Sequence, residues 1–371
     1  MQFAFTEEQD QLRAFVRQFL EEKSSEATVR ELMETESGYD EAVWAQMAEQ
    51  LGLQSLIIPE QYGGQGFTWV EMVVVLEEMG RALLCAPFFS SAILATSALI
   101  ESGDADAASD YLPQLASGEL IATVALTEEN GRWDEAGITA TATADGDSWT
   151  LDGGKHYVLD GHTAGLLIVA ARTAAGVSLF AIDGDAAGLE RTPLSTMDQT
   201  RKQAKITLSS TPGRLIGTDG AGWDTLVKVL DRAAVALAAE QVGGAQMVLD
   251  MAVQYAKDRV QFGRPIGSFQ AIKHKCADML LEVESAKSAA YYAAWCAAED
   301  NDELPAMASL AKSYCSEAYF HAASENIQIH GGIGFTWEHP AHLCFKRAKS
   351  SELLFGDPTY HRELLAQRIG L

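Results

Sequence analysis

Residues 259–270, RVQFGRPIGSFQ, decide the fold, because they interrupt an otherwise continuous helical pattern. About 223–258 before this stretch and about 269–298 after it each read as one long helix. Two glycines and a proline inside the stretch indicate a tight turn between these helices. A further helical run covers about 304–330, so the C-terminal part of the chain is expected to form a helical bundle.

Upstream of this bundle, between about 121 and 212, short strand-like runs replace the helices. The runs are 121–126, 138–143, 149–151, 156–159, 166–171, 177–182 and 205–208. Turns rich in Asp and Gly separate them. Short strands at regular spacing favour a sandwich or a barrel.

The N-terminal part reads as helices, and Thr6 and Gln9 have the spacing of a capping box at the start of the first one. Further helices are expected at about 39–51, 68–84, 89–102 and 105–116. The sequence therefore predicts an α+β protein. Its parts are an N-terminal helical domain at 1–120, a middle β-barrel or β-sandwich domain at 121–212, and a C-terminal four-helix-bundle domain at 213–371.

The composition excludes several classes of partner. The chain has 371 residues and a formal net charge of −25, which argues against binding a nucleic-acid backbone or an anionic lipid surface. No apolar stretch is long enough to predict a membrane span, and no signal peptide is visible. The five cysteines are widely spaced, so we expect reduced thiols in a cytoplasmic protein.

The stretch 259–270 is also a candidate anion-binding site. Arg259 and Arg264 each offer a fork of donors that matches phosphate. Backbone N–H groups at the start of the following helix would add to it. The alternative is a solvated connection between two helices.

A second candidate is the stretch QIHGGIGF at 328–335. It does not follow a strand, so it is not the dinucleotide fingerprint of a βαβ unit. Its glycines could simply serve a turn. In the functional interpretation, bare backbone lets a ligand approach closely, and Gln328 hydrogen-bonds a heterocycle.

Other catalytic motifs are absent from the sequence. It has no phosphate loop of the G-x-x-x-x-G-K-[ST] type, no G-x-S-x-G elbow and no H-E-x-x-H zinc motif. The histidines show no ligand spacing, and no metal site is expected. We expect His274, His339 and His342 to be surface or capping groups.

Four motifs together resemble the acyl-CoA dehydrogenase family, and the resemblance covers essentially the whole chain. They are PEQYGGQG at 59–66, EEMG at 77–80, RVQFG at 259–263 followed by Gln270 and Ala277-Asp278-Met279, and Gln328 followed by GGIGF at 331–335. The family fold is a helical domain, a β domain and a helical bundle, as the single-chain pattern also predicts.

This resemblance implies an FAD at a subunit interface. In the family, the Arg of R-x-x-F-G and the Gln eleven residues later bind the pyrophosphate side of the neighbouring subunit's FAD. The Gln before G-G-x-G reaches the same FAD. The matching residues here are Arg259, Phe262, Gln270, Gln328, Gly331 and Gly332.

The implied reaction is α,β-dehydrogenation of an acyl-CoA thioester. A carboxylate removes the α-proton, and hydride passes from the β-carbon to the flavin. The family further implies an electron-transferring flavoprotein as acceptor. The identity of the acyl group does not follow from the sequence.

The family's catalytic base is missing from both of its usual positions. Phe355 stands where the Glu before Gly-Thr would be, and Ala233 stands at the alternative position on the first helix of the bundle. Asp357 and Glu240 are the nearest acids and are weak candidates. For Asp357 we favour a helix cap before Pro358, and for Glu240 a structural role or an ion pair.

The β domain departs from the family as well. The family stretch T-E-P-x-x-G-S-D, which contacts flavin and substrate, reads TEENGRWD at 127–134. The family W-I/S-T that backs the flavin reads HYVLD at 156–160. A bulky Trp and additional carboxylates beside an FAD phosphate would be unfavourable. The chain thus keeps the residues that would bind a neighbouring subunit's FAD and loses part of the residues that would bind an FAD of its own.

This asymmetry favours one hypothesis over three others. The chain resembles the partner subunit of α2β2 heterotetrameric dehydrogenases that act on steroid-CoA or other bulky thioesters, in which the companion chain contributes the Glu. The alternatives are a homo-oligomeric dehydrogenase that uses Asp357 or Glu240 as base, a scaffold subunit without flavin, and a flavin oxidase or monooxygenase on the same fold.

Overall fold

The computed structural model describes residues 5–146 and 148–371 and divides into two compact units. The first unit consists of the chain up to Arg30, Trp69–Leu84 and Ala234–Leu371. The second consists of Glu31–Thr68 and Cys85–Ala233.

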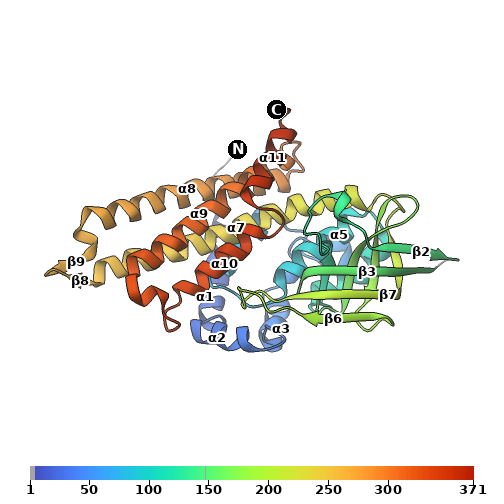
Figure 1. Ribbon diagram of the computed structural model, residues 1–371, viewed down its shortest axis with the longest axis horizontal. Helices are drawn as coiled ribbons and strands as arrows, with labels where there is room; N and C mark the ends of the chain where they lie inside the picture. The colour runs from blue at the N-terminus through green and yellow to red at the C-terminus, as the bar shows by residue number, and fades with distance from the viewer. Residues whose placement is uncertain (1–4, 147) are drawn as a thin grey trace. The chain divides into compact units, whose positions relative to one another are not determined.

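Long helices build the first unit, and Figure 1 shows several of them running side by side. They are α1 (Glu7–Lys23), α4 (Trp69–Arg81), the second part of α7 (Gly222–Asp258), α8 (Gln270–Ala298), α9 (Leu304–His330), α10 (Ala341–Leu353) and α11 (Pro358–Arg368). Short elements join them: β8 (Val260–Gln261), β9 (Arg264–Pro265), η5 (Ile266–Ser268) and η6 (Gly331–Phe335). Fully buried alanines, such as Ala290 on α8 and Ala311 and Ala322 on α9, let these helices approach closely.

The helices α4 and α7 approach each other closely, and this approach depends on one glycine from each helix. A Cβ atom on Gly243 would lie 1.8 Å from the carbonyl oxygen of Glu77. A Cβ atom on Gly80 would lie 2.0 Å from the carbonyl oxygen of Glu240. Only bare backbone fits on both sides of this crossing, which fixes where α7 lies against α4.

The start of α1 confirms the predicted capping box. The Thr6 hydroxyl accepts a hydrogen bond from the Gln9 backbone N–H at 3.3 Å. The Gln9 side-chain oxygen accepts one from the Thr6 N–H at 2.9 Å. This reciprocal pair satisfies two donors that would otherwise lack partners.

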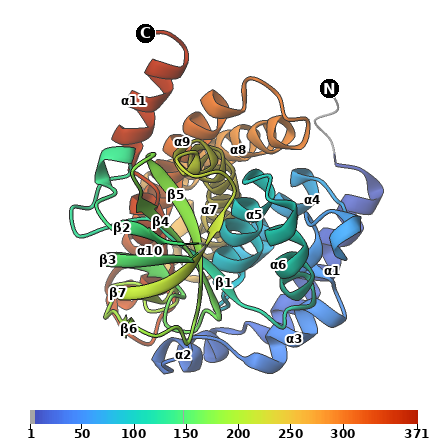
Figure 2. The same cartoon turned by 90° about the vertical axis from the view of Figure 1, so that its right-hand side faces the viewer.

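A small barrel dominates the second unit. Its strands are β1 (Ala122–Ala125), β2 (Thr141–Asp145), β3 (Ser148–Leu159), β4 (Leu166–Arg172), β5 (Val177–Asp183), β6 (Leu189–Pro193) and β7 (Gln203–Ile216). β4, β2, β3, β7 and β5 pair in that order, and β5 pairs back to β4, which closes the ring. β1 adds to β4, and β6 adds to β7. Figure 2 shows the strands fanning around the barrel. Its core includes Leu167, Phe180 and Ile206.

Helices also belong to the second unit. They are α3 (Glu41–Glu49), η1 (Leu53–Ser55), η2 (Glu60–Tyr62), η3 (Phe89–Ala95), α5 (Thr96–Glu101), α6 (Ala105–Ser117), η4 (Glu135–Gly137) and the first part of α7. The helix α2 (Glu26–Glu34) precedes α3 in the chain.

The structure confirms the predicted α+β class and corrects several details. The two strands expected at 149–151 and 156–159 are one strand, β3, with irregular pairing to β7. The helix expected at 89–102 begins as the π-helical turn η3. Neither α2 nor β6 was expected. All five side chains of β6 are exposed or half-buried, and its sequence LERTP lacks the apolar–polar alternation that identifies a strand.

No helix in the described ranges is both long enough and apolar enough to cross a membrane.

Replacing Gly243 with Ala should lower the free energy of unfolding by about 3 kcal/mol, because the added methyl group meets backbone rather than a flexible side chain. In an uncrowded helix the same change would raise the free energy of unfolding by about 1 kcal/mol. The sign of the measured change therefore distinguishes a crowded from an uncrowded position. Urea denaturation followed by circular dichroism measures the difference.

The control for this variant is Gln254→Ala, an exposed position on the same helix, where a change within about 0.5 kcal/mol is expected. Unchanged or increased stability of Gly243→Ala would show that the crossing is not tight.

Candidate functional site

The stretch 259–270 forms a short hairpin at the end of α7 (Figure 1). Val260 pairs with Pro265 and Gln261 with Arg264, which leaves Phe262 and Gly263 as the turn. Both turn residues have positive φ, 54° and 77°, as a type I′ turn requires. A phenylalanine rarely adopts this conformation, and here its side chain is 92% exposed. The hairpin therefore holds an apolar ring out into solvent.

The two arginines of this hairpin are used differently. The Arg264 guanidinium lies over the ring of Phe269, 4.1 Å from its centroid. Arg259 is exposed and has no ion pair or side-chain hydrogen bond among the described residues. Its forked donors are therefore available to an anion.

Gln270 begins α8 close to this hairpin. The N-cap residue is Phe269, whose side chain cannot accept hydrogen bonds from the first-turn N–H groups. These N–H groups, together with the positive end of the helix dipole, favour a negatively charged ligand. The exposed Gln270 side chain lies at the same point.

The second half of the candidate site is the end of α9. Gln328 is exposed on its last turn, and Gly331 and Gly332 follow in η6. Gly331 has φ +64°, and a Cβ atom on either glycine would meet nothing within 4 Å. The backbone there is open to close approach by a ligand.

The bundle places both halves at the same end of the first unit. The Asn326 side-chain amide donates to Met251 Sδ at 3.3 Å, which joins α9 to α7 near their ends. An ion pair between Lys275 and Glu325 joins α8 to α9. Figure 1 shows the β8–β9 hairpin and the end of α9 at the same side of the bundle. We name Arg259, Phe262, Gln270, Gln328, Gly331 and Gly332 the clamp.

The two positions that the sequence resemblance assigns to the base carry no ionisable group. Ala233 on α7 is fully buried. Phe355, also buried, has φ +60°, a strained value for a phenylalanine. The Lys312 ammonium donates to the carbonyl of Gly356 at 2.9 Å, and His361 Nε2 lies 3.1 Å from the carbonyl of Phe355. These contacts hold the loop at Phe355 firmly, but the Phe355 side chain cannot take a proton.

Asp357 and Glu240 have the structural roles favoured from the sequence. The Asp357 carboxylate accepts the Tyr360 backbone N–H at 2.8 Å and caps α11. Glu240 is buried and lies 3.0 Å from Arg347, which is also buried. The Glu240 carboxylate is therefore committed to an ion pair inside the helical unit.

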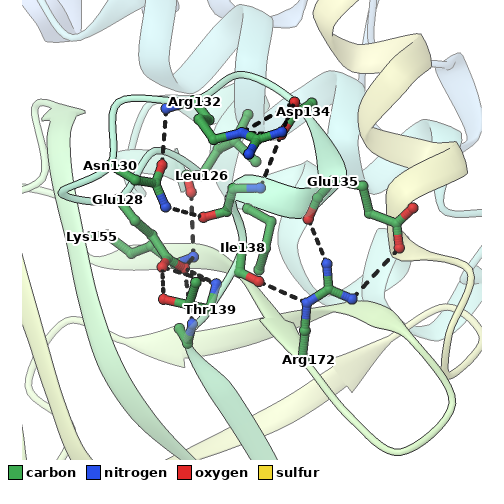
Figure 3. Close-up of polar contacts among 12 residues, drawn as sticks. Leu126, Glu128, Asn130, Arg132, Asp134, Glu135, Ile138, Thr139, Lys155 and Arg172 are labelled. Atoms are coloured by element: carbon green, nitrogen blue, oxygen red, sulfur yellow. Dashed lines mark hydrogen bonds and ion pairs between the residues drawn. The ribbon is translucent and has the colours of Figure 1, made fainter.

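The loop after β1 is closed by its own polar contacts (Figure 3). The Glu128 carboxylate accepts from the Lys155 ammonium at 2.6 Å and from the Thr139 and Ala140 backbone N–H groups at 2.9 and 3.0 Å. The Lys155 ammonium also donates to the Leu126 carbonyl at 3.3 Å.

Side chains in the outer part of this loop also form hydrogen bonds and an ion pair. Arg132 forms a forked ion pair with Asp134, and the Asn130 amide donates to the Gly137 carbonyl at 2.7 Å. Arg172 of β4 donates to the carbonyls of Glu135 and Ile138. Glu128, Asn130, Arg132 and Asp134 therefore make contacts within this region of the β domain.

The Lys155–Glu128 pair is ionic at neutral pH. Burial lowers the pKa of Lys155 to about 8, although the charge of Glu128 opposes that shift. Burial would raise the pKa of Glu128, but the charge of Lys155 and the hydrogen bonds from Lys155, Thr139 and Ala140 hold it below its ordinary value.

The sequence motifs gave no signal for Lys155, whereas His339 has the predicted capping role. Lys155 lies on the inward side of β3 with Leu151, and both are completely buried. Strand alternation could have identified a lysine facing a barrel interior, which requires a charged partner. His339 does accept the Ala341 N–H at 3.2 Å, as a capping group would, but its ring also packs on His330.

Comparison with protein families matches nearly the whole chain. The acyl-CoA dehydrogenase N-terminal domain matches residues 6–119, the middle domain residues 123–209 and the C-terminal domain residues 220–370.

Individual relatives and structures match over similar lengths. Acyl-CoA dehydrogenase IpdE2 of Mycolicibacterium smegmatis is 37% identical over 355 residues, which cover 95% of this chain and 96% of the relative. A variant of the Tcur3481–Tcur3483 steroid ACAD superposes with a TM-score of 0.88, 33% identity and 98% coverage of both chains. The ChsE4–ChsE5 complex of Mycobacterium tuberculosis gives a TM-score of 0.91 and 29% identity, covering 100% of this chain and 99% of that one.

Replacing Lys155 with Met should lower the free energy of unfolding by about 3–5 kcal/mol, because Glu128 would remain buried without a counter-charge. In the wild-type protein the contribution of Glu128 is complete above its ordinary pKa of 4.5 and is lost as the pH falls through the lowered value. The stability gap between wild type and variant should therefore narrow at acid pH in urea denaturation series.

The matched control is Glu129→Gln, which removes an exposed carboxylate next to the buried one and should change stability by no more than about 0.5 kcal/mol. A Lys155→Met variant as stable as wild type would show that the pair does not hold the loop.

Proposed function

The chain belongs to the acyl-CoA dehydrogenase family, and on that premise we propose that it serves in FAD-dependent α,β-dehydrogenation of an acyl-CoA as one subunit of a hetero-oligomer. The partner subunit supplies the carboxylate base. One contrast supports this proposal most. The donors of the clamp are exposed to solvent, whereas the two base positions carry no ionisable group.

The clamp fits the diphosphate side of an FAD. Arg259 would hold the diphosphate through its forked donors, and Gln270 would bind it together with the N–H groups that begin α8. The open backbone at Gly331 and Gly332 leaves room for the cofactor, which a side chain would fill. When bound, the flavin supplies the acceptor for the hydride that leaves the β-carbon of the thioester.

In this assignment, the residues of this chain bind the cofactor, orient it and exclude water. Arg259 places the cofactor by its charge, and Gln328 orients it by hydrogen bonding. Phe355 presents an apolar ring where a base would stand, and water gains little by lying beside it. Proton removal from the α-carbon therefore falls to a carboxylate of another chain.

Exposed apolar side chains around the clamp support a protein partner there. They are Val260, Phe262, Ile333, Phe335 and Trp337. Large apolar groups gathered at one place on a surface mark an interface, and a clamp that belongs to another subunit's FAD has to lie at one.

A homologous chain is the partner that the relatives favour. The ChsE4–ChsE5 structure is named as a complex of two chains, and the Tcur3481–Tcur3483 structure is named as a steroid ACAD. By analogy we propose a homologous dehydrogenase chain as partner and a bulky acyl-CoA, such as a steroid thioester, as substrate. An electron-transferring flavoprotein is the proposed acceptor.

The chain purified alone should be colourless, whereas co-expression with an acyl-CoA dehydrogenase-like chain that carries the Glu base should yield a yellow complex. Replacing Arg259 with Gln should weaken FAD retention in that complex about tenfold or more, since one charge-assisted contact is lost. Visible absorbance during dialysis measures retention.

Lys257→Gln is the matched control, because it removes an exposed positive charge at the end of α7, two residues before Arg259, without the forked geometry. It should leave retention unchanged. A yellow chain in the absence of any partner would favour the homo-oligomer, and absence of flavin in every combination would favour the scaffold.

The double change Glu240→Gln and Asp357→Asn should leave turnover of the complex within about threefold of wild type, because both residues are proposed to be structural. Each replacement keeps an oxygen acceptor for the same partner, Arg347 and the Tyr360 N–H respectively. Because Glu240→Gln leaves the buried Arg347 without its counter-charge, circular dichroism first verifies that the variant is folded. Loss of a true general base would cost about a hundredfold or more. Anaerobic flavin reduction by an acyl-CoA measures the rate, and a hundredfold loss would restore the homo-oligomeric alternative.

A further inference from the structure

A column of three aromatic rings joins the two halves of the clamp. Tyr255 and His330 are stacked, with ring centroids 4.1 Å apart and planes 26° apart. His330 and His339 lie 4.4 Å apart at 50°. None of these three residues belongs to the clamp, and the proposed chemistry uses none of them.

The column is attached to the clamp at both ends of the Tyr255–His330 stack. Tyr255 lies on the last turns of α7, and its carbonyl accepts the Arg259 backbone N–H at 2.8 Å. His330 is the last residue of α9, two positions after Gln328 and next to Gly331. A shift of either ring would therefore move one half of the clamp relative to the other.

Further contacts fix the orientation of the His330 ring. His330 Nδ1 donates to the Asn326 carbonyl at 2.8 Å. A Cβ atom on Gly334 would lie 3.0 Å from the Cβ atom of His330, so η6 folds tightly back over this residue. His330 is 5% exposed, and the ring cannot swing out without opening that turn.

The two imidazoles stack as neutral rings. Burial lowers the pKa of His330. Burial likewise lowers the pKa of His339, helped by His330, His342 and Arg30 and opposed by Glu26. At neutral pH the column therefore carries no positive charge that would repel its neighbours, and ordinary aromatic stacking holds it together.

We propose that Tyr255 and His330 are positioning residues that set the spacing between Arg259 and the Gly331–Gly332 backbone. The proposed FAD must meet Arg259 and Gln270 on one half of the clamp and Gln328 with the Gly331–Gly332 backbone on the other half at the same time. The column supplies the rigidity that this requires. The assignment of its purpose rests on the proposed FAD clamp, whereas the mechanical coupling is a property of the chain alone.

Hydrogen exchange of the full chain, read by mass spectrometry, tests the coupling without any ligand. Tyr255→Leu on α7 should raise exchange in residues 328–335 about fivefold, and His330→Leu on α9 should raise it by a similar factor in residues 259–270. Tyr255→Phe and His330→Phe keep a ring in the column and should change exchange less than about twofold. The Tyr255 hydroxyl makes no hydrogen bond within the described residues, so Tyr255→Phe removes no polar contact.

Val283→Ala, a fully buried position on α8, is the control for general loss of stability. The proposal is overturned if each Leu variant affects only its own segment, if the Phe variants behave like the Leu variants, or if Val283→Ala raises exchange in both clamp segments equally. In the flavin-containing complex, Tyr255→Leu should weaken FAD retention and Tyr255→Phe should not. If exchange is coupled but no complex holds FAD, the proposed function fails and the coupling stands.

Discussion

The backbone contact between α4 and α7 is the constraint on which the first unit depends. Glycines on both helices allow the two backbones to touch, and a methyl group on either would meet a carbonyl. α7 is 37 residues long, so fixing one point of it fixes much of the unit. Glu240 lies at the crossing, and Tyr255 and Arg259 follow towards the helix end. The position of the clamp is therefore set by packing far from the clamp itself.

Some polar side chains of this protein are buried and hydrogen-bonded within the chain, whereas others are exposed to solvent and could bind a ligand. Lys155 and Lys312 are fully buried, and their ammonium groups donate to carbonyls, a carboxylate or a hydroxyl. Burial without such partners would cost several kcal/mol, by rough estimate. Arg259 and Gln270, in contrast, are exposed. This separation is what a subunit would show if it provides a rigid frame and offers its donors to a cofactor held mainly elsewhere.

The fold class could be predicted from the sequence because periodicity is a local property. The long helical runs, most of the short strands and the capping box at Thr6 appeared where expected. The errors came from elements that depend on their neighbours. β6 is a strand because it pairs with β7, and β3 is one strand because β7 runs alongside its whole length. The glycine motifs were likewise recognisable, but their openness to a ligand was not.

The sequence by itself determined the family, the order of helical and β parts, and the absence of a base at the two usual positions. These follow from residue identity and spacing along the chain. Only the tertiary structure decided that Glu240 is paired with Arg347, that Glu128 is held by Lys155, and that Tyr255 stacks on His330. Lys155 and Glu128 are 27 positions apart in the chain, and Arg347 and Glu240 are 107 positions apart. Tyr255 and His330 lie on different helices. Such contacts exist because folding buries them together, and no local pattern records which partner a buried group will meet.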